Sequence, residues 1–137
     1  MGERARDYTR LSVGDAGPAI SHPLTRTDLV MYAGASGDFN PMHHDEIAAQ
    51  KAGLPSVFGH GMFTAGLLAT AITDYVGIGN LKSYRVRFTK QTWPGEVLTT
   101  SVTVREKRAG NEVVLDCSVV NEQGETKIQG EAVAVIS

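Results

Sequence analysis

Two polar side chains in the first half of the chain have the types and the spacing of an acid–base pair. Asp38 and His43 lie five residues apart within the run Ser36–Asp45. Pro41 disfavours helical backbone at Asn40, so a loop is expected here, and a loop would let the two side chains converge. A carboxylate beside an imidazole can activate water and move protons. The alternative is structural: Asp38 would cap a turn, and His43 would be a surface histidine.

A second run, Gly59 to Met62, comes directly before an uncharged segment that is expected to be helical. The first amides of a helix have no intrahelical partner, and the helix dipole favours negative charge there. Glycine lets a ligand approach the backbone, so the N–H of Gly61 is a candidate donor to an oxyanion. Alternatively, the run is only a tight turn into a helix, with His60 as a packing residue.

Other candidate residues are less distinctive. Arg85, Arg87 and Lys90 form either a basic edge that could meet phosphates or a solvated strand face. The only cysteine, Cys117, occupies an inward strand position and is expected to be a core thiol. A single cysteine excludes an intramolecular disulfide and a cysteine-based zinc cluster. The sequence contains no phosphate-binding loop, dinucleotide fingerprint, zinc-protease motif or hydrolase elbow.

Three helices are expected to position these groups. The first follows Thr25, which has an acidic residue three positions on, close to a capping box, and it ends at Gly34 and Gly37. The second spans Asp45–Ala52, with acidic residues in its first turn. The third begins with the run Met62–Thr73, which carries no charge on any face, unlike the two-sided pattern of a surface helix, and it is expected to end at Gly77 and Gly79. It is therefore expected to be buried on most sides.

The second half of the chain has the two-residue alternation of β-strands, and one further strand is expected near residues 18–24. Turns at Ala109–Asn111 and at Gly124 favour an antiparallel meander. We expect an α+β fold in which a long antiparallel sheet wraps around the central helix, within one domain spanning residues 1–137. The inward positions expected in the last three strands are Leu98, Val102, Val104, Val113, Leu115, Cys117, Val119, Ile128, Ala132, Ala134 and Ile136.

The net charge and the hydropathy of the chain argue against a nucleic-acid-binding protein and against a membrane-spanning protein. The chain has 137 residues, with 13 basic and 15 acidic side chains, so its net charge is −2. A nucleic-acid-binding protein would carry a basic excess, so nucleic acid is not expected as a partner. The uncharged run Met62–Thr73 is too short to span a bilayer, which needs roughly 20 residues, and no apolar signal core follows residues 1–6. A cytoplasmic protein without membrane insertion is expected.

The run Tyr32–Asp45 closely resembles the hydratase-2 motif of the MaoC-like family of (R)-specific enoyl-thioester hydratases and dehydratases. The run Gly59–Met62 is similar to that family's entry to its central helix, and Phe88–Glu96 is similar to a strand–turn segment further along. The likeness covers nearly the whole chain and shows no departure at the two candidate catalytic positions. It implies a hot-dog fold, in which a long helix is wrapped by an antiparallel sheet.

The resemblance also implies a reaction of fatty-acid metabolism, the reversible hydration of a trans-2-enoyl thioester to the (R)-3-hydroxyacyl thioester. Asp38 and His43 would hold the water, with Asp38 as the favoured base, and the following helix N-terminus would keep His43 neutral. Gly61 would donate to the thioester oxygen, and Asn40 would orient the loop. The residues expected to bind the acyl substrate are Ser36, His60 and Met62, and those expected to bind coenzyme A or an acyl carrier protein are Arg85, Arg87 and Lys90.

The family pairs two hot-dog subunits, so a homodimer or a heterodimer with a related subunit is expected, with no metal and no redox cofactor. One alternative is a thioesterase, in which water attacks C1 instead of C3. Others are a subunit that acts only with a non-catalytic hot-dog partner and a ligand-binding hot dog without chemistry. The intact Asp38–His43 pair favours the hydratase. Acyl chain length, the choice of carrier, the pathway and its direction are left open by the sequence.

Overall fold

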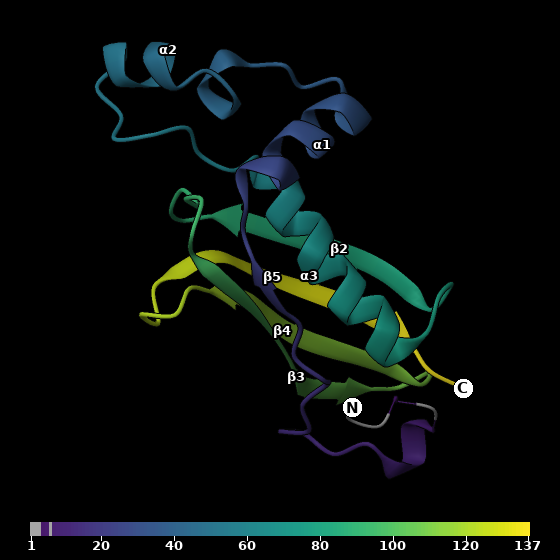
Figure 1. Cartoon of the computed structure of the whole chain (residues 1–137). Helices are drawn as coiled ribbons and strands as arrows, with labels where there is room; N and C mark the ends of the chain where they lie inside the picture. Colours follow the sequence, from purple (N-terminus) through teal and green to yellow (C-terminus); the bar gives the residue numbers. More distant parts are fainter. Residues whose placement is uncertain (1–3, 6) are drawn as a thin grey trace.

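The computed structural model describes residues 4–5 and 7–137. The N-terminal segment of residues 1–6, behind which no apolar signal core was expected, lies mostly outside the described residues. Figure 1 shows the arrangement of the elements. In chain order they are η1 (Tyr8–Arg10), β1 (Ser21–Pro23), α1 (Arg26–Ser36), η2 (Pro41–His43), α2 (Glu46–Lys51), α3 (Gly61–Val76), β2 (Leu81–Phe88), β3 (Val97–Arg108), β4 (Glu112–Val120) and β5 (Thr126–Val135), where η marks a 3₁₀ turn.

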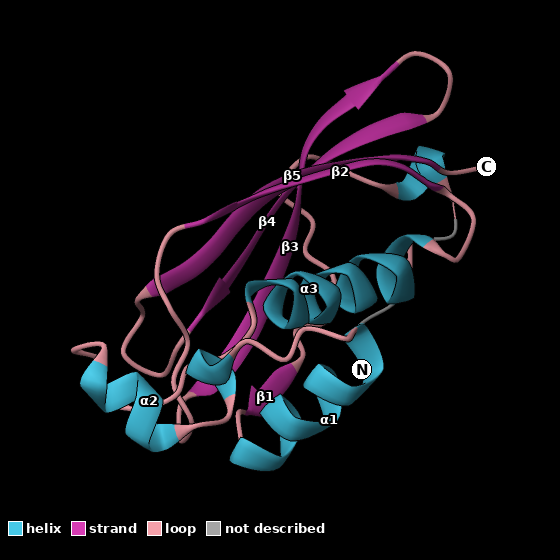
Figure 2. Ribbon diagram, turned by 90° about the horizontal axis from the view of Figure 1, so that it is seen from above, coloured by secondary structure: helices cyan, strands magenta, loops and turns pink. Residues whose placement is uncertain are grey.

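The five strands form one antiparallel sheet in the order β1-β3-β4-β5-β2. Two hairpins join β3, β4 and β5, and β2 pairs with β5 at the other edge of the sheet. The long helix α3 packs along one face of this sheet, as the two views in Figures 1 and 2 show. The predicted α+β fold is therefore confirmed, as are the antiparallel meander and the short strand near residue 20.

The core lies between α3 and the sheet. The alternation predicted for β3, β4 and β5 is confirmed, because every inward position named above is buried. From α3, Leu68 and Ile72 are fully buried against these strands. Cys117 is part of the same apolar cluster, as expected of a core thiol.

The helix α3 differs from the expectation at its start and in burial. It starts one residue earlier than predicted, at Gly61, and it ends at Val76, directly before the expected stop at Gly77. Four residues on one face are exposed at a spacing of four, Met62, Gly66, Thr70 and Asp74. The prediction of burial on most sides is therefore wrong for this face, because the sheet covers only one side of the helix. No helix in the described part of the chain is long and apolar enough to cross a membrane.

The helices α1 and α2 lie at one end of the molecule, beside the start of α3 (Figure 1). The capping box at the start of α1 is confirmed, since Thr25 and Asp28 exchange side-chain to backbone hydrogen bonds. Gly34 lies inside α1 and does not end it, contrary to prediction. Gly37 ends it, because a φ of 77° turns the backbone away while its N–H still binds the carbonyl of Ala33.

Candidate active site

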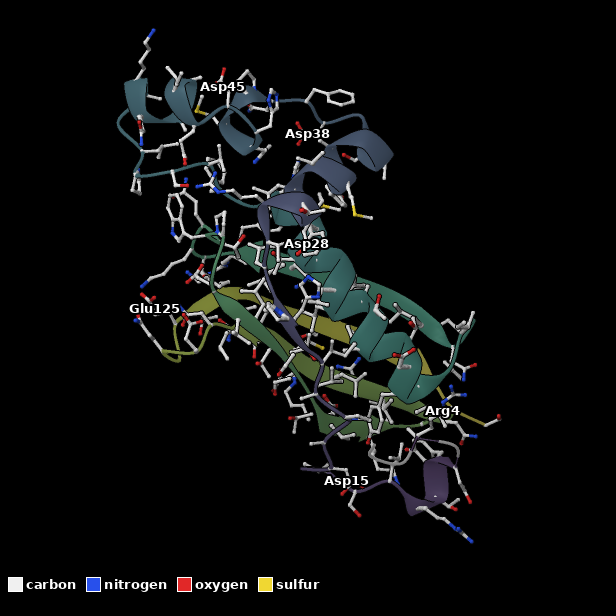
Figure 3. All side chains as sticks on the ribbon, in the orientation of Figure 1. Arg4, Asp15, Asp28, Asp38, Asp45 and Glu125 are labelled. Atoms are coloured by element: carbon white, nitrogen blue, oxygen red, sulfur yellow. The ribbon has the colours of Figure 1, made fainter. Side chains whose placement is uncertain are left out.

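The two polar runs meet where the loop between α1 and α2 passes the start of α3. Figure 3 shows Asp38 at this end of the molecule, on the segment that follows α1. The ring of His60 lies with Nε2 3.1 Å from the backbone carbonyl oxygen of Asp38. The ring of His43 stacks on the ring of His60, with centroids 3.8 Å apart and an interplanar angle of 27°. Residues far apart in the sequence therefore form one cluster.

The loop that carries Asp38 is shaped by its own short side chains. Asn40 has φ −55° and ψ 124°, which is not helical, as its position before a proline predicts. Its side-chain oxygen accepts the N–H of Met42 at 3.1 Å and starts the 3₁₀ turn Pro41–His43, which was not expected. Asp38 accepts the N–H of Asn40 at 3.3 Å. These bonds orient the backbone between Asp38 and His43.

Ser36 lies at the end of α1 and hydrogen-bonds to the backbone on both sides. Its hydroxyl donates to the carbonyl of Tyr32 at 2.7 Å and accepts the N–H of Asp38 at 3.1 Å. The hydroxyl hydrogen of Ser36 is thus already used within the protein. Substrate binding by Ser36 stays a prediction.

Asp38 and His43 face each other across a short gap. Nε2 of His43 lies 3.8 Å from a carboxylate oxygen of Asp38, which is too long for a direct hydrogen bond and suits one bridging water. Nδ1 of His43 lies 2.7 Å from the carbonyl oxygen of Phe58. A carbonyl only accepts, so Nδ1 carries the hydrogen, and in the neutral ring Nε2 offers its lone pair to the gap. The Asp38 side chain is 52% exposed, whereas that of His43 is 8% exposed.

His60 is buried and contacts both of these residues, through a hydrogen bond to the Asp38 carbonyl and by stacking on the His43 ring. It is 2% exposed, and because a carbonyl faces Nε2, this nitrogen carries the hydrogen. Its Nδ1 has no hydrogen-bond partner among the described residues. Burial lowers the pKa of His60 and is the largest effect. The hydrogen bond to the Asp38 carbonyl raises the pKa by less, and the nearby His43 lowers it further. The buried ring is therefore neutral at neutral pH, and substrate binding by His60 stays a prediction.

Asp38, His43 and His60 are the one group in the described part of the chain whose ligand atoms could reach a common metal ion. The two imidazole rings, however, are stacked nearly parallel. The lone pair of an imidazole nitrogen lies in the plane of its ring, so two stacked rings do not direct their lone pairs to one point. Each ring also uses one nitrogen to donate to a carbonyl. The arrangement suits hydrogen bonding to water better than coordination of a cation.

The start of α3 opens onto a cavity of about 600 Å³. The first amides of the helix, at Gly61 and Met62, have no intrahelical acceptor. A methyl group on Gly61 would come within 2.9 Å of the Phe88 ring, so glycine keeps this approach to the backbone open. The Met62 side chain is 61% exposed and lies in the same first turn. The cavity is lined by residues that include Phe58, Gly59, Gly61, Thr64, Phe88 and Trp93.

The three basic residues predicted to bind a carrier do not lie together. Lys90 lines the cavity beside α3, and its ammonium lies 2.8 Å from a carboxylate oxygen of Glu125. Arg85 and Arg87 point to the opposite face of the sheet, because they alternate with inward-facing neighbours on β2. There they line a second, shallower hollow beside Arg105.

Two residues of the site were missed by sequence reasoning, because they act through backbone carbonyls. Phe58 accepts from His43, and Thr92 accepts the N–H of Gly59 at 2.8 Å. A backbone carbonyl leaves no mark on residue type, so no sequence signal could have identified these contacts.

Comparison with known proteins places the chain in a family. Residues 14–125 match the family model described as MaoC like domain. The chain is 40% identical over 82 residues to 3-hydroxyacyl-thioester dehydratase Y of Mycobacterium tuberculosis, which covers 57% of this chain and 28% of that protein. It therefore spans less than a third of the length of this relative.

Solved structures share the fold over nearly the whole chain. R-hydratase PhaJ1 from Pseudomonas aeruginosa superposes with a TM-score of 0.86 at 30% identity, covering 95% of this chain and 86% of that one. The ChsH1–ChsH2 complex from Mycobacterium tuberculosis has a TM-score of 0.83 at 23% identity, covering 92% and 98%. The predicted hot-dog fold is thereby confirmed. With its motif loop, buried helix and curved sheet in place, the chain belongs to the MaoC-like hydratase and dehydratase family.

Proposed function

We propose that the protein is an (R)-specific enoyl-thioester hydratase, which also runs in reverse as a 3-hydroxyacyl-thioester dehydratase. The observation that carries the proposal is the pair of Asp38 and His43, separated by 3.8 Å and held beside the first turn of α3. One water between the two side chains and one amide donor at Gly61 would supply what the reaction needs.

In the hydration direction, the water oxygen forms a bond to C3 of the enoyl thioester. Asp38 accepts one proton of this water, and the other proton stays on the new hydroxyl group. His43 receives a hydrogen bond from the water at Nε2 and orients it. The electron pair of the C2–C3 double bond shifts toward the thioester, and its oxygen takes up negative charge that the Gly61 N–H stabilises. The proton held by Asp38 then passes to C2, which completes the addition and restores the carboxylate.

The remaining roles follow from position in the site. Asn40 keeps the loop in the shape that sets the Asp38–His43 distance. Met62, the buried His60 and the exposed Ser36 would border the acyl thioester. Lys90, at the cavity, would be the first basic group to meet the phosphates of coenzyme A or an acidic carrier protein. Arg85 and Arg87 would contribute only to a carrier that reaches the outer face of the sheet.

We also propose that the chain acts as a homodimer or with a related hot-dog subunit. Two features support a partner. The strand β2 lies at an edge of the sheet, where backbone groups have no neighbouring strand. The exposed face of α3 carries no charge from Met62 to Thr70. In addition, the ChsH1–ChsH2 structure is described as a complex.

The test is hydration of crotonyl-CoA by the purified protein, followed as loss of the enoyl-thioester absorbance, with the Asp38→Asn variant measured alongside. We expect loss of absorbance that depends on Asp38, with a 3-hydroxyacyl product and no free thiol. Release of thiol would instead identify a thioesterase. If the folded protein leaves crotonyl-CoA, longer enoyl-CoA substrates and enoyl carrier protein all unchanged, both alone and with a related hot-dog subunit, the proposed function is wrong.

A further inference from the structure

A buried ion pair lies at the wall of the cavity, in residues that the mechanism above does not use. Lys127, near the start of β5, has a side chain that is only 3% exposed. Its ammonium lies 2.9 Å from a carboxylate oxygen of Glu96, whose side chain is 13% exposed. Lysine and glutamate are seldom buried, and a buried pair often stabilises a fold no better than apolar residues of similar size. The location of the pair therefore needs a reason other than stability.

Both members of the pair hold the backbone of one short loop. The Lys127 ammonium donates to the carbonyl of Gln91 at 2.9 Å. On the other side, Glu96 accepts the N–H of Trp93 at 2.6 Å. The second carboxylate oxygen of Glu96 also accepts from the side-chain amide of Asn121 at 2.6 Å, which fixes the carboxylate in turn. The backbone is thus anchored immediately before and immediately after Thr92.

Thr92 connects this anchored loop to the start of α3. Its carbonyl accepts the N–H of Gly59 at 2.8 Å, and its buried side chain packs directly against Gly59. A Cβ at position 59 would overlap the Thr92 hydroxyl, so the two backbones can approach only because residue 59 is glycine. Gly59 is two residues before Gly61. The direction of the Gly61 N–H therefore depends on where Thr92 is held.

We propose that Lys127 and Glu96 are positioning residues, which fix the loop from Gln91 to Trp93 so that the Gly61 N–H is aimed at the thioester oxygen. The proposal rests on the proposed function in its last step, the role of Gly61. Its first step, that the ion pair fixes the Gly59 amide through Thr92, stands on the structure of this chain alone. The two steps can be tested separately.

The variants are Lys127→Met, Glu96→Gln and the double variant. Lys127→Met leaves a carboxylate without its cation in a buried place, so this protein is expected to lose stability. The double variant contains neither charge and is expected to regain most of the melting temperature. It still lacks the bond to the Gln91 carbonyl, so kcat for crotonyl-CoA hydration is expected to stay about 10- to 100-fold low, with KM changed less. If Lys127 and Glu96 had a purely structural role, kcat per folded molecule would recover in the double variant together with its stability.

The matched control is Lys107→Met. Lys107 also donates to a backbone carbonyl, that of Leu11 at 2.8 Å, and lies over the ring of Tyr8. It is near the far end of β3, about 30 Å from the Glu96 end by the rise of a strand. Loss of this lysine is expected to lower the melting temperature and to leave kcat unchanged.

Amide hydrogen exchange by NMR tests the first step without any activity. The Gly59 N–H is expected to be protected in the wild type and in Lys107→Met, and to exchange at least tenfold faster in the double variant. If Gly59 stays protected in the double variant, the proposal is overturned, whatever the activities are. If the wild type hydrates no substrate but Gly59 responds as expected, the proposed function fails and the positioning of Gly59 by the ion pair is supported.

Discussion

Asp38 and His43 are separated by a distance that one water molecule can bridge, and the two side chains have different hydrogen-bond partners and different exposure. The Phe58 carbonyl holds the hydrogen of His43 on Nδ1, so its other nitrogen can only accept from water as long as the ring is neutral. The Asp38 carboxylate is half-exposed and accepts a backbone N–H from Asn40. The buried Nε2 of His43, as an acceptor, and the half-exposed carboxylate of Asp38, as a base, thus face the same position for a water molecule.

Because both side chains act on one water, the effects of removing them on the activation free energy should not be additive. We expect Asp38→Asn and His43→Ala each to lower the hydration rate by about 10²- to 10⁴-fold. The double variant should be little slower than the slower single variant, since the second change removes nothing further from a water that is already lost. Steady-state rates, with circular dichroism to establish folding, check this expectation. Fully multiplicative losses would show that the two residues act in separate steps.

His60 should make the fold sensitive to acid. Burial lowers its pKa in the folded state below the ordinary value of 6.5, which the unfolded chain retains. The unfolded state therefore binds the proton first, and the contribution of His60 to stability is complete above about pH 6.5. It is lost as pH falls from there through the folded-state pKa, with a slope of at most about 1.4 kcal/mol per pH unit.

Denaturant unfolding across this pH range measures that slope. The His60→Phe variant keeps a ring that can stack on His43 and cannot be protonated, so its stability should fall less steeply below pH 6.5. The exposed His44 is the control, and His44→Gln should retain the slope of the wild type. An unchanged slope in His60→Phe would contradict the explanation.

At the scale of the element, two glycines of α3 provide a matched comparison. Gly66 is exposed, and a methyl group added there meets no atom within 4 Å. In protein that assembles as the wild type does, Gly66→Ala should therefore add up to about 1 kcal/mol of stability through helix propensity and leave the rate unchanged. Gly61→Ala makes the same chemical change in the first turn, but its methyl group would push against Phe88 and crowd the amide.

We expect Gly61→Ala to lower kcat/KM by about 10-fold or more, approaching the 10²- to 10³-fold loss caused by removing an oxyanion donor. Its melting temperature should stay near that of the wild type, because the Phe88 ring is half-exposed and can move. Equal activity of the Gly61→Ala and Gly66→Ala proteins would remove Gly61 from the mechanism.

The elements show what could be predicted from the sequence and why. The inward faces of β3, β4 and β5 could be predicted because the alternation of apolar residues directly reflects which face is covered. The Thr25 capping box was visible for a similar reason, since its bonds connect residues that are close in sequence. The exposed face of α3 was not predicted, because an uncharged surface looks the same in a sequence whether the sheet or a second subunit covers it.

The same distinction applies to the site. Contacts within one loop could be predicted from the sequence, whereas contacts between distant segments could not. Asp38 and His43 belong to one loop, so their encounter could be expected from local sequence. The stacking of His60 on His43 joins two segments through tertiary structure, as does the Lys127–Glu96 pair. No spacing rule connects residues across such distances. By the alternation of β5, Lys127 is at an outward position like Gln129, and only its partners show why its charge is buried.

For the whole molecule, the core predicts a loss of stability in alkali. Burial raises the pKa of Cys117 from 9.0 to about 12 and raises that of Tyr84 above its ordinary value of 10.0. The unfolded chain therefore releases these protons first, so the stability they contribute is complete below about pH 9 and is lost as pH rises toward the folded-state values. Each group contributes a slope of at most about 1.4 kcal/mol per pH unit.

Urea unfolding between pH 8 and about pH 11 tests this expectation against the Cys117→Ala variant. The variant leaves a space in the core and should be less stable at every pH. Its stability should nevertheless fall less steeply above pH 9, because one of the weak acids whose pKa burial raises is gone. Parallel curves for the two proteins would show that Cys117 ionises alike in both states.

The loop that carries the reacting side chains is held by fewer buried residues than the sheet. This difference should matter when the protein is used at elevated temperature. The helices on either side of the reactive loop bury few residues, Leu29 and Ala33 from α1 and Ala49 from α2, whereas the strands supply most of the core. Weakly buried segments open locally at a lower cost than global unfolding. On warming, turnover should therefore stop several degrees before the β-sheet signal melts, and brief heating within that interval should be fully reversible on cooling.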